Sequence, residues 1–397
     1  MTDHNLIQEI SELKNHISYS KNIGFFFGAG TSCSLGIPGI SDLTKNVEDA
    51  LKDNSAKIFK FVKDDLKALV SGRDVNIEDI LNQLRNIREL TKESETKNYQ
   101  GVSGKDAALT DIDICKTIYE IITHAELKAE LSSTKRFFAW YNNLNRDFTK
   151  EIFTTNYDLI IEKALESSEI PYFDGFVGSY EPFFWQQSID HHVQSGDLTK
   201  NWIRLWKIHG SLSWFWSSKD SDKSTHIIRI GHFGESKSPN KELVIYPSKD
   251  KYDSSRKQPF IAYFDRLRDY LLSGELLFII SGYSFSDQHI NEIIMNCLRQ
   301  NNRLFINVFL YSDSDVKKLS EISSVYMNLH IFGPTKAIIN GELGEWSFTE
   351  EDGKPSKITE LFWDEGKKQF TLGDFNALVN FLVTSSGNSE KIQKEAS

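Results

Sequence analysis

The chain has 397 residues, of which 39% are hydrophobic, and this length predicts two or three folded domains rather than a disordered polymer. The formal charge of −10, from 46 basic and 56 acidic residues, disfavours broad electrostatic capture of nucleic acid. Three widely separated cysteines with no Cys-x-x-Cys pair argue against a disulfide framework or a cysteine-held zinc ion.

The start of the chain, Met1–Asn5, lacks the basic and then apolar pattern of a signal peptide. No apolar run approaches the ~20 residues that a membrane-spanning helix needs. We therefore expect a cytoplasmic protein that makes no membrane contact.

The first part of the chain alternates helical and strand patterns. Apolar spacing predicts a helix over residues 5–19, and a buried strand follows at 22–27. A second helix is expected to begin near Ser41 or Asp42, either of which could cap it. Residues 45–149 are charged and helical in pattern, so we interpret them as a helical insertion between two strands of one sheet. Within them, the polar residues 91–105 predict a loop.

Beyond the insertion, apolar strand patterns again alternate with helical ones. Strands are expected at 150–158, 203–209, 243–246, 275–282 and 303–311, and helices at 159–165, 260–272 and 287–300. This order predicts an α/β fold with a Rossmann-like parallel sheet, formed by residues 1–44 and 150–315 and covered on both faces. A smaller C-terminal region, 316–397, is expected to serve packing or oligomerisation and to contain a helix over 374–383.

A glycine turn follows the first strand directly and reads Gly28-Ala29-Gly30-Thr31-Ser32, with Pro38 shortly after. Such a turn offers backbone N–H groups to a phosphate, and a side chain at Gly28 or Gly30 would block the approach of a pyrophosphate. A plain strand-to-helix turn explains the same residues, so the turn alone leaves nucleotide binding open.

Three further strand ends carry small or polar residues. They read Thr154-Thr-Asn156-Tyr-Asp158, Lys207-Ile-His209-Gly210 and Ser281-Gly282-Tyr283-Ser284. The carboxyl ends of parallel strands line one crevice, so we expect these segments and the glycine turn to meet at one ligand.

Taken in order, these segments resemble the motifs of sirtuins. Gly28–Ser32 with Gly36-Ile-Pro38 resembles the opening motif of sirtuins, and Thr155–Asp158 resembles their Gln-Asn-x-Asp motif. His209-Gly210 resembles the catalytic His-Gly pair, and Gly282–Ser284 resembles the Gly-Thr-Ser motif. Asn307 falls where sirtuins often carry an adenosine-contacting asparagine.

The resemblance is closer to the sirtuin-like domains of prokaryotic antiphage defence than to deacylases. Phe153-Thr-Thr-Asn-Tyr-Asp158 and Gly282-Tyr-Ser-Phe-Ser-Asp287 are typical of that group. Deacylases carry a zinc module of four cysteines, which the three cysteines of this chain cannot build. They also usually have Phe-Arg after Gly-Ile-Pro, whereas this chain has Gly39-Ile-Ser-Asp42 at that place.

The resemblance implies an NAD⁺ hydrolase that releases nicotinamide and ADP-ribose, with NAD⁺ as substrate and no zinc. It implies Asn156 and His209 as catalytic residues, Asn156 orienting a water or the ribose and His209 acting as a base. The binding residues that it implies are Gly28, Ala29, Gly30, Thr31, Ser32, Pro38, Asp158, Gly282, Tyr283, Ser284, Asp287 and Asn307. Among these, Asp158 would accept from the nicotinamide carboxamide, and Ser284 and Asp287 would bond ribose or phosphate.

Simpler explanations exist for the same side chains. Asn156 and Asp158 could cap the helix that follows them, and His209 could be a core histidine beside Trp206 and other aromatic residues. The adjacent pair His191-His192 has no supporting ligand pattern, so we expect no metal site there.

The resemblance also suggests how the activity is used. It implies an effector that depletes NAD⁺ during antiphage defence, works as a homo-oligomer, and can act beside a HerA-type hexameric ATPase. The alternatives are a sensor that binds NAD⁺ or ADP-ribose without turnover, or a protein deacylase or ADP-ribosyltransferase.

Overall fold

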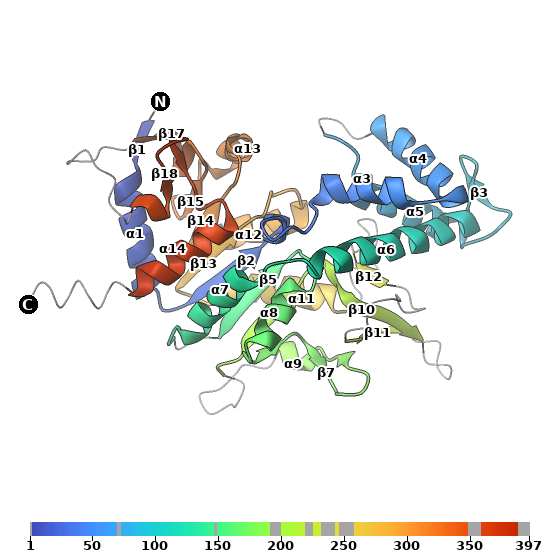
Figure 1. Cartoon of the computed structure of the whole chain (residues 1–397), viewed down its shortest axis with the longest axis horizontal. Helices are drawn as coiled ribbons and strands as arrows, with labels where there is room; N and C mark the ends of the chain where they lie inside the picture. The colour runs from blue at the N-terminus through green and yellow to red at the C-terminus, as the bar shows by residue number, and fades with distance from the viewer. Residues whose placement is uncertain are drawn as a thin grey trace, which may run out of the picture.

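The computed structural model describes residues 2–69, 73–146, 149–190, 200–218, 225–231, 243–245, 258–347 and 359–387. Figure 1 shows an elongated α/β molecule, in which a part built around a large sheet is joined to a mostly helical part. The predicted α/β class is confirmed by this mixture of a mostly parallel sheet and helices.

The main sheet of the described residues has ten strands in the order β1-β17-β16-β15-β14-β13-β2-β5-β9-β6. They are β1 (Thr2–Asn5), β2 (Ile23–Phe27), β5 (Lys150–Thr154), β6 (Tyr172–Phe173), β9 (Ile203–Lys207), β13 (Leu276–Ser281), β14 (Leu304–Phe309), β15 (Leu329–Phe332), β16 (Lys336–Ile339) and β17 (Glu342–Ser347). Neighbours pair in parallel except at β15–β16 and β16–β17. All residues of β2 and β13 are buried, as expected for strands covered on both faces.

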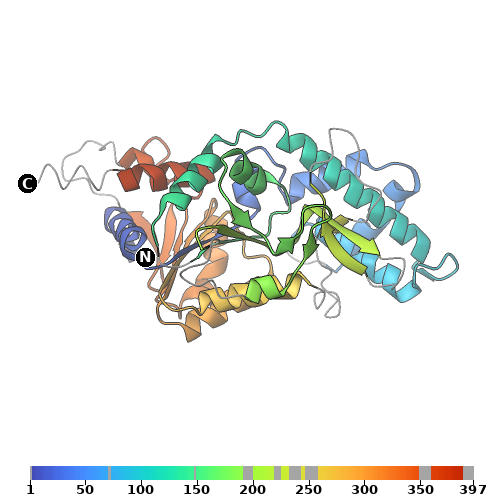
Figure 2. The ribbon, with the colours of Figure 1, turned by 90° about the horizontal axis from the view of Figure 1, so that it is seen from below.

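Helices cover both faces of the main sheet, which lies between two helical layers in Figure 2. One face packs against α1 (Leu6–Tyr19), α7 (Ser132–Asn143), α8 (Ile160–Ser167) and α14 (Phe375–Gly387). The other packs against α11 (Phe260–Leu271), α12 (Gln288–Gln300) and α13 (Asp313–Ser323). The strand alternation decides which side chain enters which core, since Phe25 and Phe27 join the first layer and Phe26 the second.

The helical part has a core of its own, shared with a second sheet. Its helices are α3 (Ile40–Ala50), α4 (Asp53–Lys67), α5 (Ile77–Thr91) and α6 (Gly104–Glu126). The second sheet has the order β12-β10-β11-β8-β7 and consists of β7 (Phe176–Val177), β8 (Phe183–Phe184), β10 (Gly210–Ser218), β11 (Thr225–Arg229) and β12 (Leu243–Ile245). Phe215 and Ile228 from this sheet pack in one cluster with the helices.

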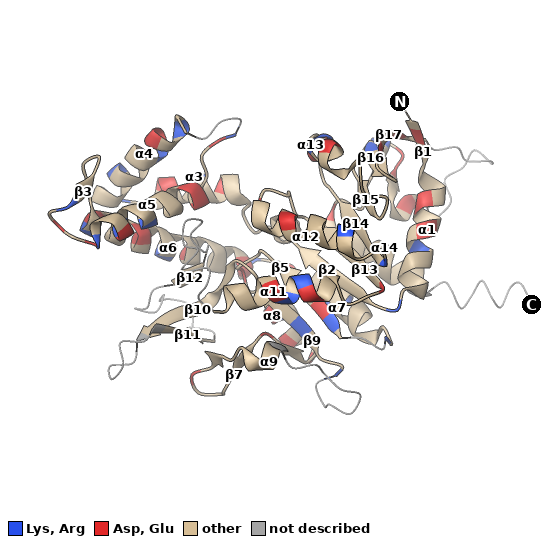
Figure 3. Cartoon of the chain, turned by 180° about the vertical axis from the view of Figure 1, so that it is seen from behind, with Lys and Arg blue, Asp and Glu red and all other residues tan. Residues whose placement is uncertain are grey.

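The remaining elements are short. They are α2 (Ala29–Cys33), a hairpin of β3 (Asn98–Tyr99) and β4 (Val102–Ser103), α9 (Gln187–Asp190), η1 (Thr359–Leu361), and a pair of β18 (Trp363–Asp364) and β19 (Gln369–Phe370). Among the residues that the structure describes, no helix is long and apolar enough to cross a membrane. Lys and Arg lie among Asp and Glu along α3 to α6 in Figure 3.

The predicted strands and helices of the sheet domain are confirmed to within a few residues, but three local expectations are wrong. Helix α3 begins after Gly39, which provides no side-chain cap, so neither Ser41 nor Asp42 is the N-cap. The segment 91–105 includes the β3–β4 hairpin and is not simply a loop. The strand predicted at 243–246 forms as β12, but it belongs to the second, antiparallel sheet and not to the parallel one. That sheet was not predicted, because its other strands are short or lie in aromatic segments without clear alternation.

The structure adds detail to the predicted domains, whose boundaries stay predictions. Helix α7 lies within the predicted insertion, 45–149, yet it packs on the main sheet with α8 and α14. Strands β15, β16 and β17 lie at one side of the main sheet, so part of the segment 316–397 extends this sheet. Residues beyond 387 lie outside the described part of the chain.

Candidate functional site

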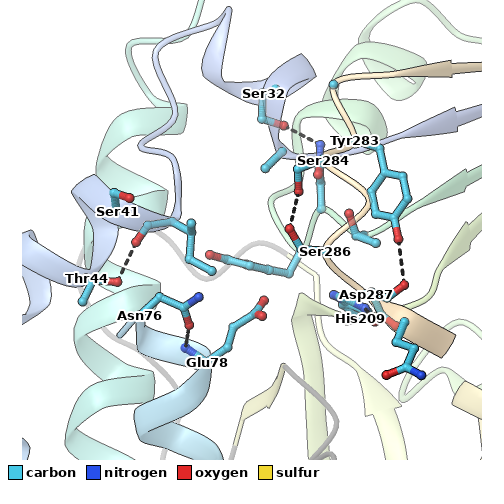
Figure 4. Close-up of a pocket in the computed structure, with 18 of the residues that line it drawn as sticks. Ser32, Ser41, Thr44, Asn76, Glu78, His209, Tyr283, Ser284, Ser286 and Asp287 are labelled. Atoms are coloured by element: carbon cyan, nitrogen blue, oxygen red, sulfur yellow. Dashed lines mark hydrogen bonds and ion pairs between the residues drawn. The ribbon is translucent and has the colours of Figure 1, made fainter. Parts of the chain in front are cut away.

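A cavity of about 1820 Å³ lies between the helical part and the carboxyl ends of the central strands. In Figure 4, Ser41, Thr44, Asn76 and Glu78 of the helical part lie on one side, and Ser32, His209, Tyr283, Ser284, Ser286 and Asp287 lie on the other. The four segments expected to converge all contribute lining residues, so the sequence-predicted crevice exists.

The glycines of the first turn are needed because two turns pack against each other. A Cβ on Gly28 would lie 2.4 Å from the carbonyl oxygen of Gly282, and one on Gly30 would lie 2.7 Å from the Gly282 Cα. Gly282 itself has a φ of +68°, and its Cβ would lie 2.5 Å from the Thr31 nitrogen. The nearest obstacle to a side chain here is therefore the protein backbone, not a bound pyrophosphate as expected from the sequence.

The N–H groups of this turn are mostly engaged within the protein. Gly28 N donates to Ser281 O at 3.0 Å, Gly30 N to Gly282 O at 2.9 Å, and Thr31 N to Gly28 O at 3.0 Å. The first two bonds tie the end of β2 to the end of β13, and the third closes the glycine turn on itself. The turn thus reaches the cavity through Ala29, Gly30 and Ser32 rather than through a full set of free N–H groups.

The Asn156 side chain is fixed by three acceptors of the glycine turn. Its Nδ2 donates to Gly28 O at 3.0 Å, to Thr31 Oγ1 at 3.1 Å and to Ser32 Oγ at 2.9 Å. Since Thr31 and Ser32 donate their own hydroxyl hydrogens to Gly28 O and Asp158, their oxygens accept from the amide. The carbonyl Oδ1 is buried and makes no hydrogen bond with any residue that the structure describes. Asn156 therefore offers an oriented, unsatisfied acceptor at the cavity, which a helix cap would not.

Asp158 has two roles at once. Its Oδ2 accepts from Ser32 Oγ at 2.7 Å, which joins the glycine turn to the turn after β5. Its Oδ1 accepts from Ile160 N at 3.1 Å at the start of α8, so the capping explanation holds in part for this residue.

His209 lines the cavity and is held by Asp287. The His209 Nε2 lies 2.9 Å from Asp287 Oδ2, while Asp287 Oδ1 accepts from His289 N and Ile290 N and caps α12. Burial tends to raise the pKa of Asp287, but the hydrogen bond and charge of His209, with these two N–H groups, lower it to about 2. Asp287 is thus ionised at neutral pH and orients the imidazole, so His209 is not simply a packed core histidine.

The remaining predicted residues after β13 form the cavity wall. The Tyr283 hydroxyl donates to Asn291 Oδ1 at 2.9 Å and to Asp287 O at 3.2 Å. These bonds hold the turn after β13 against the start of α12, so this hydroxyl has a structural role. Ser284 and Ser286 are exposed to the cavity and bond each other at 2.8 Å. Their hydroxyls are the groups here that can turn toward a ligand.

The structure does not bring every predicted residue to the cavity. Asn307 lies within β14, is buried, and is not among the cavity-lining residues. Gly28 and Thr31 lie behind the lining and act through Asn156, while Pro38 lines the cavity directly. His191 and His192 lie outside the described residues, and the described part of the chain has no cluster of three His, Cys, Asp or Glu side chains suited to a metal ion.

Two buried charged residues beside the site were missed by sequence reasoning. Lys207 and Glu126 have side chains that are 2% and 1% exposed, and both bond to the turn that carries Asn156 and Asp158. A signal for Lys207 is present, since it is a charge at the end of a short strand with the apolar residues Ile203, Leu205 and Trp206, two residues before His209. Glu126 gives no such signal, because a glutamate at the end of a charged helix is ordinary.

Comparisons with known proteins agree with the sequence motifs over part of the chain. Residues 150–330 match the family model described as a SIR2-like domain, and this match supports a sirtuin-like protein. Among curated proteins, no sequence matches the chain.

Solved structures of Sir2 homologues are similar to the chain at low identity. A Sir2 homologue in complex with NAD is 13% identical, with a TM-score of 0.42, covering 100% of this chain and 98% of that one. A mutant Sir2 homologue in complex with ADP-ribose is 11% identical, with a TM-score of 0.41, covering 96% of this chain and 98% of that one.

Proposed function

We propose that the protein is an NAD⁺ glycohydrolase, with Asn156 and His209 as its catalytic residues. The observation that carries this proposal is the buried, unpartnered Oδ1 of Asn156, aligned by its amide nitrogen in a cavity that also contains the His209–Asp287 pair. The SIR2-like match includes all three of these residues and supports the same assignment. The cavity exceeds the ~300–1,000 Å³ of ordinary small-molecule pockets, so its volume suits a dinucleotide.

In the proposed reaction, the oxygen of a water molecule forms a bond to C1 of the nicotinamide ribose. The carbon–nitrogen bond to nicotinamide breaks, and its electron pair leaves with the neutral base. Asn156 Oδ1 accepts a hydrogen bond from the attacking water and orients it, and His209 takes the proton that the water loses. Asp287 holds His209 in place and stabilises the charged imidazolium.

The other contacts of the proposal concern binding. Asp158 accepts from the carboxamide of nicotinamide in exchange for part of its bond to Ser32. The hydroxyls of Ser284 and Ser286 turn toward ribose or phosphate oxygens. The glycine turn positions Asn156, and its Ala29 and Ser32 face the cavity beside the phosphates.

The test is a mass balance on the purified chain. After incubation with NAD⁺ and no acceptor, chromatography should recover nicotinamide and ADP-ribose in equal amounts. Activity that strictly requires an acylated peptide or a protein acceptor would contradict hydrolysis and favour a deacylase or a transferase. NAD⁺ binding without any product, with and without candidate partners, would instead identify a sensor.

We further propose that the activity serves antiphage defence in the cytoplasm by depleting NAD⁺. The resemblance of the Phe153–Asp158 and Gly282–Asp287 motifs to defence proteins supports this use. Because uncontrolled hydrolysis would be toxic, we expect control by homo-oligomerisation or by a HerA-type ATPase. Co-expression with a neighbouring ATPase should give one shared gel-filtration peak and altered NAD⁺ turnover, and two separate peaks with unchanged turnover would contradict this partner.

A further inference from the structure

The peptide bond between Asp158 and Leu159 is held at both of its polar ends by buried charges of opposite sign. The Lys207 ammonium donates to the Asp158 carbonyl oxygen at 2.5 Å. The Glu126 carboxylate accepts from the Leu159 N–H at 2.6 Å. Hydrogen bonds to charged groups are about twice as strong as neutral ones, so this peptide plane is unusually restrained.

Each of the two charges is balanced by a side chain on the first turn of α8. Lys207 pairs with Glu162 at 2.7 Å, and Glu126 pairs with Lys163 at 2.5 Å. Buried charges persist where they are paired and hydrogen-bonded, and both conditions hold here. The four side chains and the peptide therefore form one connected, largely buried unit.

The two charges reach this peptide from different parts of the fold. Lys207 is the last residue of β9 in the main sheet, and Glu126 is the last residue of α6 in the helical part. Helix α6 packs against α3, α4 and α5, so its position depends on the helical part as a whole. The site turn is thus bonded to both sides of the cavity.

We propose that Lys207 and Glu126 are positioning residues that clamp the Asp158–Leu159 peptide and thereby fix Asn156 and Asp158 in the site. Rotation of this peptide would change ψ of Asp158 and shift Ile160 N, which donates to the Asp158 carboxylate. The same carboxylate accepts from Ser32, whose hydroxyl oxygen accepts from Asn156, so the change would reach Asn156. The effect of the clamp on turnover rests on the proposed NAD⁺ hydrolysis, whereas the clamp itself does not.

The test compares Glu126→Met, which removes the acceptor, with Glu126→Gln, whose amide oxygen still accepts from Leu159 N–H. In Glu126→Met, hydrogen exchange of peptides covering residues 155–162 should rise at least tenfold and kcat for nicotinamide release should fall at least tenfold. ADP-ribose affinity, measured by calorimetry, should stay within threefold, because this ligand lacks nicotinamide. Glu126→Gln should stay within threefold in all three measurements. Should Glu126→Met fail to fold, Lys207→Met is expected to show the same pattern.

A matched control is Asp111→Asn, which breaks another buried charge cluster on the same helix. Asp111 is 2% exposed and pairs with Arg85 and Arg88, away from the site turn. It should destabilise the helical part without raising exchange at 155–162. Equal effects of Asp111→Asn and Glu126→Met, or less than twofold changes in Glu126→Met, would overturn the clamp. If the wild type releases no nicotinamide, with and without candidate partners, the proposed function fails, and the exchange comparison still decides the clamp.

Discussion

Replacing Asp287 with asparagine tests the His209–Asp287 pair at almost constant shape. The carboxylate only accepts hydrogen bonds, so the hydrogen of a neutral imidazole sits on Nε2, 2.9 Å from Asp287 Oδ2. In Asp287→Asn, the amide N–H faces the same ring nitrogen and favours the opposite tautomer. The proposed base would then present the wrong nitrogen, and we expect kcat to fall by ~10²–10⁴-fold, the range of a general-base contribution.

The stability cost of this substitution follows from the pKa of Asp287. The pKa is lowered from 3.8 to about 2, and one unit corresponds to about 1.36 kcal/mol, so the interactions of the carboxylate contribute ~2 kcal/mol at neutral pH. Because the folded-state pKa is depressed, this stability is fully present above about pH 4 and is lost as the pH falls through about 2. Asp287→Asn keeps the α12 cap, so it should lose at most ~2 kcal/mol at pH 7, and its stability should no longer depend on pH in this acidic range.

The assay combines urea unfolding between pH 2 and pH 7 with NAD⁺ turnover and ADP-ribose calorimetry. The reasoning requires a large loss of kcat with ADP-ribose affinity changed by less than about threefold. A kcat within threefold of wild type would refute the orienting role of Asp287. Unchanged stability at pH 7 would refute the electrostatic argument, since the helix α12 cap through Oδ1 survives the substitution.

Two further predictions concern stability. Gly282→Ala should destabilise the protein by at least ~2 kcal/mol, because its Cβ would lie 2.5 Å from Thr31 N. The control Gly36→Ala, at a φ of +87° with open space around the Cβ, should cost only ~1 kcal/mol, and equal losses in urea unfolding would contradict the packing argument. Burial and the nearby Glu12 raise the pKa of Glu9 to about 7. The unfolded chain then releases this proton at lower pH than the folded protein does, so stability should fall as the pH rises from about 4.5 to 7. Glu9→Gln should therefore have a higher Tm than the wild type at pH 8, and an equal or lower Tm would contradict this.

The sheet domain could be predicted because local sequence and tertiary environment agree there. The runs Gly24–Phe27 and Leu276–Ile280 are apolar at every position and end in small residues, which a doubly covered parallel strand requires. The α1 helix has the matching apolar spacing and buries Leu6, Ile10 and Leu13. Strands at the edge gave weaker signals, as with β1, whose residues Thr2–Asn5 are mostly exposed and are strand only because β17 lies beside them.

The site was predicted at the level of which segments meet, and less well at the level of what each group does. Asn156 and His209 reach one cavity because they follow neighbouring parallel strands. Asp287 was expected to bond ribose or phosphate, but in the structure its carboxylate bonds His209 and the start of α12. Contacts between residues distant in sequence, such as Glu126 with Leu159, depend on how the helical part docks, and no local pattern encodes them.

The most direct test of the central claim is nicotinamide release from NAD⁺ by Asn156→Ala and His209→Ala beside the wild type. Asn46→Ala and His124→Ala, which change exposed residues of the helical part, are the matched controls. We predict that the wild type and both controls release nicotinamide at similar rates and that both site variants lose at least a hundredfold while still binding ADP-ribose. Site variants that keep the wild-type rate would contradict the assignment of this cavity as an NAD⁺ hydrolase site.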